Sequence, residues 1–219
     1  MKRVALLLTL AIAFASCQKD LDFETSTGGN NTGEDTYQPI TKGSYWKYKD
    51  SAFTGQTTLM TVTGQTKTIN GKSYHVISSE ATGQPAVEGY FYVNKPVYGV
   101  RGEVPGGQGV LDYTHLNDTA SVGYTWTDDM GIIAQFPARF TGEIIERGIS
   151  KVVEGKTYND VIHTRLELEY ELPIFGWTSF GSYEYYIAKN IGIIRIESNV
   201  GFAGVGVTTV MNLIEYSIK

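Results

Sequence analysis

The stretch HTRLELEYEL, residues 163–172, decides the fold class because its apolar and charged residues alternate with a period of two. One face carries Leu166, Leu168, Tyr170 and Leu172, and the other carries Glu167, Glu169 and Glu171. This alternation is typical of a β-strand with one face in a core and one in water, whereas an amphipathic helix repeats its apolar residues every three or four positions. We therefore predict a half-buried strand of an antiparallel sheet.

Similar strand patterns recur along the chain between turn signals. TKTINGKSYHVIS, residues 66–78, places Asn70-Gly71 between two alternating runs, which predicts a tight hairpin with a positive φ at Gly71. The best helix candidate is TDDMGIIAQF, residues 127–136, and Gly131 weakens it. Further strands are predicted at residues 43–50, 57–63, 87–103 (two strands), 138–146, 182–188, 191–197 and 207–218.

Two segments of the chain resemble each other, namely GQTKTINGKSY (residues 64–74) and GISKVVEGKTY (residues 148–158). The identical positions, 84 apart, are Gly64, Lys67, Gly71, Lys72 and Tyr74 against Gly148, Lys151, Gly155, Lys156 and Tyr158. Trp46 and Trp126 precede them in the same order, and we expect both to lie in the core. This order indicates a duplicated β-meander, although common strand and turn residues could also match by coincidence.

The pattern predicts an all-β fold: an antiparallel, strongly curved sheet or barrel built from two tandem meander repeats. The repeats cover about residues 43–103 and 123–197, and a final strand covers 207–218. One domain would span residues 37–219. A sandwich is the alternative way to bury one face of so many strands.

The N-terminal segment has the layout of a secretory signal. Lys2 and Arg3 precede an apolar run, residues 4–14, that is too short to span a bilayer. FASC, residues 14–17, then resembles the lipobox of bacterial lipoproteins. The resemblance implies that residues 1–16 are removed and that Cys17, the only cysteine, carries acyl chains such as palmitate and attaches the protein to a membrane. A plain signal peptide is the alternative.

Residues 17–36 follow as a polar, acidic and glycine-bearing stretch, which predicts a flexible tether. Its start, QKDLDFE (residues 18–24), resembles the export tag of surface lipoproteins of Bacteroidota. That resemblance implies an outer-membrane, lipid-anchored protein exposed at the cell surface. An ordinary acidic linker, with attachment facing the periplasm, is the alternative.

Composition and motifs argue against several functions. Without residues 1–16 the chain has 16 basic and 23 acidic residues, so its net charge moves from −5 to −7, which excludes a basic nucleic-acid footprint. The three histidines, His75, His115 and His163, are not at metal-ligand spacing, and no nucleophile motif occurs. We therefore expect no catalytic residue, no metal and no cofactor.

LPIFGWTSFGSY, residues 172–183, is a candidate functional segment, because it is rich in aromatic residues although it connects two predicted strands, where loops are usually polar. Phe175, Trp177 and Phe180 could form an exposed lip that binds a ligand or partner. Alternatively, the segment folds over the end of the sheet and fills the core. The exposure of these three side chains distinguishes the two.

The body also resembles uncharacterised Bacteroidota lipoproteins, through Trp46-Lys47-Tyr48 and the strand pair within residues 186–193. That resemblance implies no established activity. We expect a non-enzymatic binding or accessory protein for an apolar ligand, a glycan or an envelope protein. A structural subunit of an outer-membrane complex is the alternative, and a hydrolase is less favoured.

The lipobox interpretation predicts the effect of Cys17→Ser. Because serine has no thiol to acylate, the precursor should stay uncleaved or the protein should be released in soluble form. Growth with a clickable fatty acid measures this directly, and label that persists on the variant would contradict the lipobox.

Overall fold

The computed structural model describes residues 35–51, 55–103, 109–202 and 205–219. The predicted signal peptide (residues 1–16), Cys17 and most of the tether lie outside the described residues. All regular elements in the described ranges are β-strands, which confirms the all-β prediction. Among these residues, none forms a helix long and apolar enough to cross a bilayer.

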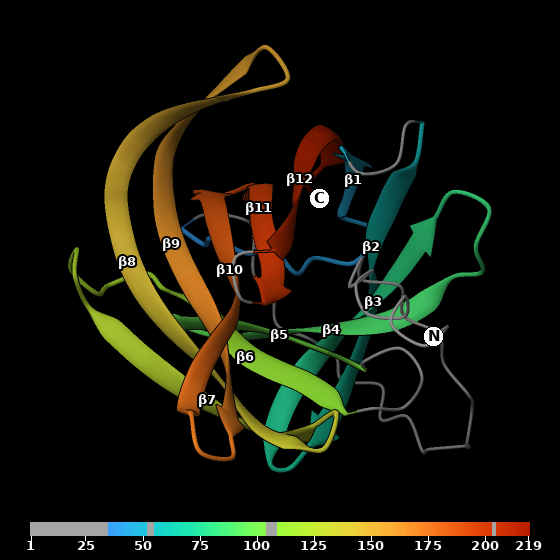
Figure 1. The fold of residues 1–219 in the computed structure, drawn as a ribbon. Coiled ribbons are helices and arrows are strands. Elements are labelled where there is room, and N and C mark those ends of the chain that lie inside the picture. Colours follow the sequence, from blue (N-terminus) through green and yellow to red (C-terminus); the bar gives the residue numbers. More distant parts are fainter. Residues whose placement is uncertain (1–34, 52–54, 104–108, 203–204) are drawn as a thin grey trace.

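The chain forms twelve strands in two consecutive sets of six (Figure 1). The first set is β1 (Tyr45–Asp50), β2 (Thr57–Ile69), β3 (Lys72–Ala81), β4 (Val87–Asn94), β5 (Val97–Glu103) and β6 (Val110–Asn117). The second set is β7 (Thr125–Ile133), β8 (Phe136–Val153), β9 (Lys156–Leu172), β10 (Gly176–Ala188), β11 (Gly192–Phe202) and β12 (Val205–Ser217).

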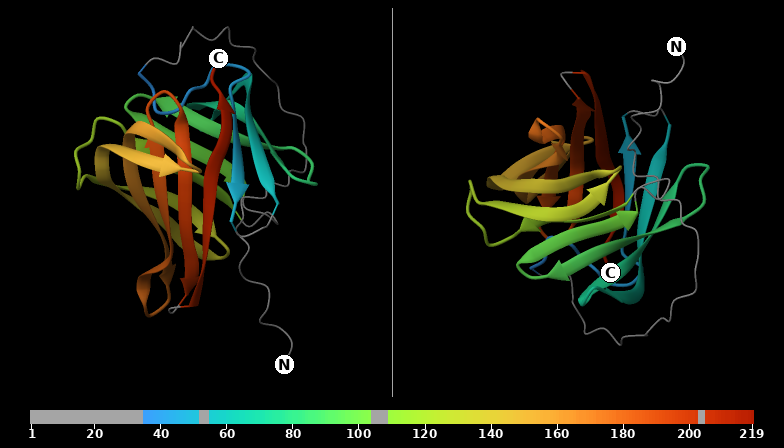
Figure 2. Two further views of the ribbon diagram at one scale, coloured as in Figure 1. Left: turned by 90° about the horizontal axis from the view of Figure 1, so that it is seen from above. Right: turned by 60° about the horizontal axis from the view of Figure 1, so that its bottom comes forward.

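The strands form one antiparallel sheet in the order β6-β5-β4-β3-β2-β1-β12-β11-β10-β9-β8-β7. The first and last strands of the chain are therefore neighbours, with Tyr45 opposite Ser217. The sheet curls until its edge strands, β6 and β7, approach each other, so the fold is a nearly closed barrel (Figures 1 and 2). Because each set of six is a meander, every turn after an odd-numbered strand lies at one end of the barrel.

Side chains join β6 to β7, since in the described ranges no backbone ladder pairs these two strands. The backbone N–H of Thr114 donates to Asp128 Oδ2 (2.7 Å), and the carbonyl of Thr114 accepts from Trp126 Nε1 (3.1 Å). The β7 side chains thus satisfy backbone groups of β6 that a paired strand would otherwise satisfy. We call this junction of β6 and β7 the seam. Trp126, expected in the core, is instead half-buried at the seam.

The two long hairpins fold back over the outer face of the sheet. At the β8–β9 tip, Glu154 accepts from Asn212 on β12 (2.7 Å) and lies 3.8 Å from Lys49 on β1. On the β2–β3 hairpin, the hydroxyl of Tyr74 donates to Asp112 on β6 (2.8 Å). The strand segments beneath these hairpins are therefore covered on both faces.

The two hairpins correspond in detail to the matched sequence segments. Asn70-Gly71 has φ values of 51° and 78°, and Glu154-Gly155 has 48° and 79°. The positive φ predicted for Gly71 is confirmed, as the two-residue turn requires. Whether the two complete sets of strands superpose stays a prediction.

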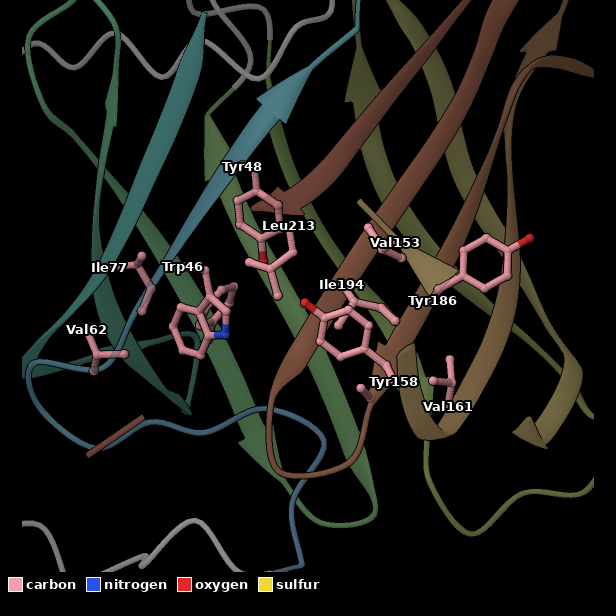
Figure 3. Packing of buried hydrophobic residues seen from close by; sticks show 12 residues of the cluster. Trp46, Tyr48, Val62, Ile77, Val153, Tyr158, Val161, Tyr186, Ile194 and Leu213 are labelled. Atoms are coloured by element: carbon pink, nitrogen blue, oxygen red, sulfur yellow. The ribbon is translucent and has the colours of Figure 1, made fainter. Parts of the chain in front are cut away.

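The core has two main clusters, and residues on both the inner and the outer side of β9–β11 are buried. Consecutive residues such as Val161-Ile162 and Ile193-Ile194 belong to different clusters. Figure 3 shows one cluster, in which Tyr48 lies beside Leu213 and Ile194 lies beside Tyr158. Burying each large apolar side chain contributes about 1.5–3 kcal/mol.

Two local predictions are wrong. Residues 127–133 belong to β7 rather than to a helix, because their apolar residues alternate and pair with β8. Residues 172–183 are not a long loop. Only residues 173–175 form the turn, and β10 begins at Gly176 because it continues the ladder with β9.

The seam predicts a steric coupling between Gly142 on β8 and Trp126. A Cβ at residue 142 would clash with the indole, so Gly142→Ala should displace Trp126 and destabilise the barrel by about 1–3 kcal/mol. Urea unfolding measures this loss.

Trp126→Phe provides the control, because its smaller ring leaves room for the added methyl group. The double variant should therefore lose less stability than the sum of the two single variants. Strictly additive losses would show that the two sites are not coupled.

Candidate ligand-binding cavity and apolar hairpin tips

An apolar cavity of about 90 Å³ lies inside the barrel between the first set of strands and β10–β12. Most of its lining is apolar or aromatic, from Tyr48, Met60, Ile77, Phe91, Val100, Leu111, Tyr113, Tyr185, Ile193, Ile196 and Met211. Gly89 and Gly102 also line it, and their lack of a side chain leaves this space open. The cavity is the described feature best suited to hold a small apolar group.

The inner wall of the cavity is made of tyrosines that pair with one another or with backbone. The hydroxyls of Tyr113 and Tyr185 are 2.8 Å apart, and the hydroxyl of Tyr48 donates to the carbonyl of Ile193 (2.8 Å). Burial raises the pKa of Tyr113 to about 12 and raises the pKa of Tyr185 well above its usual range. These hydroxyls therefore stay neutral at physiological pH and offer no strong base.

The lining of the cavity extends toward the end of the barrel that holds the turns after odd-numbered strands. Ser79, Glu103 and Leu111 line it there, near the ends of β3, β5 and β6, and Glu103 is exposed. Arg101 also contributes, and its guanidinium is held by Asp112 at 2.8 Å. Arg101 is opposite both Tyr90 and Asp112 in the sheet, so this ion pair lies on the outer face, where the β2–β3 hairpin reaches Asp112 through Tyr74.

His115 is buried in the same core without a polar partner. Its side chain is fully buried, its ring lies 5.8 Å from that of Tyr185, and neither ring nitrogen has a hydrogen-bond partner among the described residues. Burial lowers the pKa of His115 to about 3. The imidazole therefore stays neutral and acts as a core residue at physiological pH.

The aromatic segment singled out in the sequence projects from the barrel as the β9–β10 hairpin. Phe175 is 78% exposed and Trp177 is 38% exposed, whereas Phe180 is half-buried and packs edge-on against Tyr170. Trp177 lies over the guanidinium of Arg139, 4.1 Å from its ring centroid. Two of the three side chains are therefore accessible, as a binding lip requires.

The cavity and the aromatic hairpin are separate features, because none of Phe175, Trp177 and Phe180 lines the cavity. Sequence reasoning missed the cavity, since it depends on which strands face one another across the barrel. The one local signal was the pair of inward glycines, Gly89 and Gly102, at strand positions where a side chain would fill the core.

A second, polar depression lies on the outer face over β9–β12. It is lined by Glu167, Ser179, Gly181, Ser182, Asn199, Gly201 and Gly206. Its lining includes no aromatic ring to stack on a sugar, so it does not favour a glycan site. Within the described ranges, no three His, Cys, Asp or Glu side chains are grouped as metal ligands.

Comparison with known proteins identifies the fold alone. Over 84% of this chain and 99% of theirs, two solved structures from Bacteroidetes are similar to it. One is a candidate lipoprotein from Parabacteroides distasonis (14% identity, TM-score 0.54), and the other is a candidate exported protein with a YmcC-like fold from Bacteroides fragilis (10% identity, TM-score 0.51). No family model and no curated protein matches the sequence.

His115 predicts a specific loss of stability in acid. Its pKa is about 3 in the folded state and about 6.5 when unfolded, so below about pH 6.5 the unfolded chain binds a proton that the folded chain does not. Stability should therefore fall between about pH 6.5 and 3, by roughly 2–3 kcal/mol at pH 4.5.

The variant His115→Leu isolates this contribution from the carboxylates, which also titrate in acid. Urea unfolding at pH 7.5 and 4.5 should show a smaller acid loss for the variant than for the wild type. Equal losses in both proteins would contradict the assignment.

Proposed function

We propose that this protein is a non-enzymatic cell-envelope lipoprotein, anchored through acylated Cys17, whose barrel binds an apolar ligand. The apolar cavity carries the proposal. It supports an apolar ligand in preference to a glycan, which needs polar groups and an aromatic platform.

The size of the cavity favours a slender ligand. A volume of about 90 Å³ lies below the roughly 300–1,000 Å³ of sites for drug-sized molecules. An unbranched hydrocarbon chain fits such a space better than a fused ring system. Met60 and Met211 line the cavity, and because methionine side chains are flexible, the lining can adjust to a chain that enters.

The chemistry of the lining supports binding rather than catalysis. Its buried tyrosines have raised pKa values, and Arg101 is paired with Asp112. A hydrolase needs an activated nucleophile beside a base, and the lining residues include neither a cysteine nor a histidine.

The proposed location is the outer membrane, with the body at the cell surface. Its support is the lipobox-like FASC, the following QKDLDFE and the similarity in fold to a candidate lipoprotein and a candidate exported protein. A structural subunit of an envelope complex is the second candidate, and the exposed hairpin tips are the observation that favours it.

Filling the cavity tests the function. The purified full chain should bind N-phenyl-1-naphthylamine, an apolar fluorescent probe, and Gly102→Leu should weaken binding about tenfold, the equivalent of about 1.4 kcal/mol of lost contact. Glu88→Leu is the matched control, because it adds the same side chain on the exposed face of the neighbouring strand.

Native mass spectrometry of the same protein would identify any apolar molecule that co-purifies with it. Equal probe binding by wild type and Gly102→Leu would show that the cavity is not the binding site.

A further inference from the structure

Two neighbouring hairpin tips display apolar side chains to solvent at one end of the barrel. Ile132 and Phe136, at the β7–β8 tip, are 61% and 37% exposed, and Ile174 and Phe175, at the β9–β10 tip, are 101% and 78% exposed. The tips are adjacent because β8 pairs with β9 up to Ala138 opposite Tyr170. We call these four residues the apolar tips.

The backbone of the β9–β10 turn holds Ile174 outward. Ile174 has a φ of 76°, a region that β-branched residues rarely adopt. Gly176, two residues later, also has a positive φ. The side chain gains no burial from this conformation within the monomer, since it is fully exposed. Such a convex tip fits a soft apolar phase better than a flat protein surface.

An amphipathic ring and a cation lie directly behind the tip. Trp177 lies on β10, two residues after Phe175. The guanidinium of Arg139 lies against the indole ring of Trp177 and forms an ion pair with Glu169 (2.8 Å). The order from the tip inward is therefore hydrocarbon, indole and charge. A bilayer presents the same order of depth, because tryptophan concentrates at its interface and charged groups stay at the headgroups.

The anchor can reach the same plane as the apolar tips. The described body begins at the opposite end of the barrel, where Asp35 forms an ion pair with Lys189 (2.6 Å) beside the β10–β11 turn (Figure 2). Strand β10, of 13 residues, spans about 43 Å. The 18 residues from Cys17 to Glu34 can extend to about 60 Å, which exceeds that span.

We propose that the apolar tips insert into the phospholipid bilayer that holds the Cys17 anchor. This inference rests on the lipid anchor of the proposed function and adds an orientation to it. The apolar tips and the cavity-lining residues Ser79 and Glu103 lie toward the same end of the barrel, since all are next to turns that follow odd-numbered strands. The insertion therefore turns this end of the cavity toward the bilayer.

Trp177 is the reporter for the test. The acylated full chain is reconstituted into phosphatidylcholine vesicles with and without brominated acyl chains, which quench tryptophan on contact. Trp46 is buried and Trp126 is half-buried at the seam, so Trp177 should give most of the quenching. Trp177→Phe should remove most of it.

Phe175→Asp then tests insertion without removing the reporter. It should lose most of the quenching while the protein stays anchored and keeps its circular dichroism spectrum. Its matched control is Val152→Asp, an equally drastic change at an exposed position on the far β8–β9 hairpin, which should leave quenching unchanged. Quenching no greater than in Trp177→Phe, or unaffected by Phe175→Asp, would overturn the proposal.

Other outcomes are distinguishable. If the apolar tips instead pair with a second copy, Trp177 is shielded from lipid and cross-links between copies form through residue 175, which overturns the proposal. If mass spectrometry shows no acyl group on Cys17, both the proposed lipid anchor and the proposed membrane orientation are contradicted. Probe binding in the cavity is measured without vesicles, so its failure would affect only the proposed ligand.

Discussion

The structure depends on how a twelve-stranded sheet closes at its two free edges. The backbone N–H and carbonyl of Thr114 on β6 face β7, and Asp128 and Trp126 satisfy them. Arg147 extends this closure by donating to the carbonyls of Asp118 and Ala120 in the connection between the two strands. Because this closure uses side chains, the two edge strands can approach each other without a regular backbone ladder.

The β2–β3 and β8–β9 hairpins fold back over the sheet, and the burial they add explains how the barrel can be stable while it keeps an internal cavity. Lys151 lies over the ring of Tyr186, and Lys67 lies over that of Tyr90, each covering the outer face of its own set of strands. Apolar residues that would otherwise face water on β9–β11 are therefore buried outside the barrel as well as inside it. Part of the stabilisation from burial thus comes from the outer layer, and the interior need not be completely filled.

The sequence predicts local features well because they depend on nearby residues. The alternation at 163–172 places Leu166 and Leu168 inside, as found, and Asn70-Gly71 forms the expected turn. The seam, the cavity and the half-buried position of Trp126 arise from contacts between distant strands, so periodicity could not reveal them. The aromatic segment was recognised as unusual, but its division into a turn and a strand depends on pairing with β9.

The pairing of β1 with β12 has a consequence for the chain's connectivity. The backbone N–H of Lys219 donates to the hydroxyl of Ser44 (3.1 Å), so the two ends of the folded body are adjacent, and the β6–β7 connection crosses a seam without a ladder. A circular permutant that joined these ends and opened between β6 and β7 would therefore keep every paired strand. Its new termini would lie at the seam, and the β1–β12 pair would become an ordinary hairpin at the centre of an open meander.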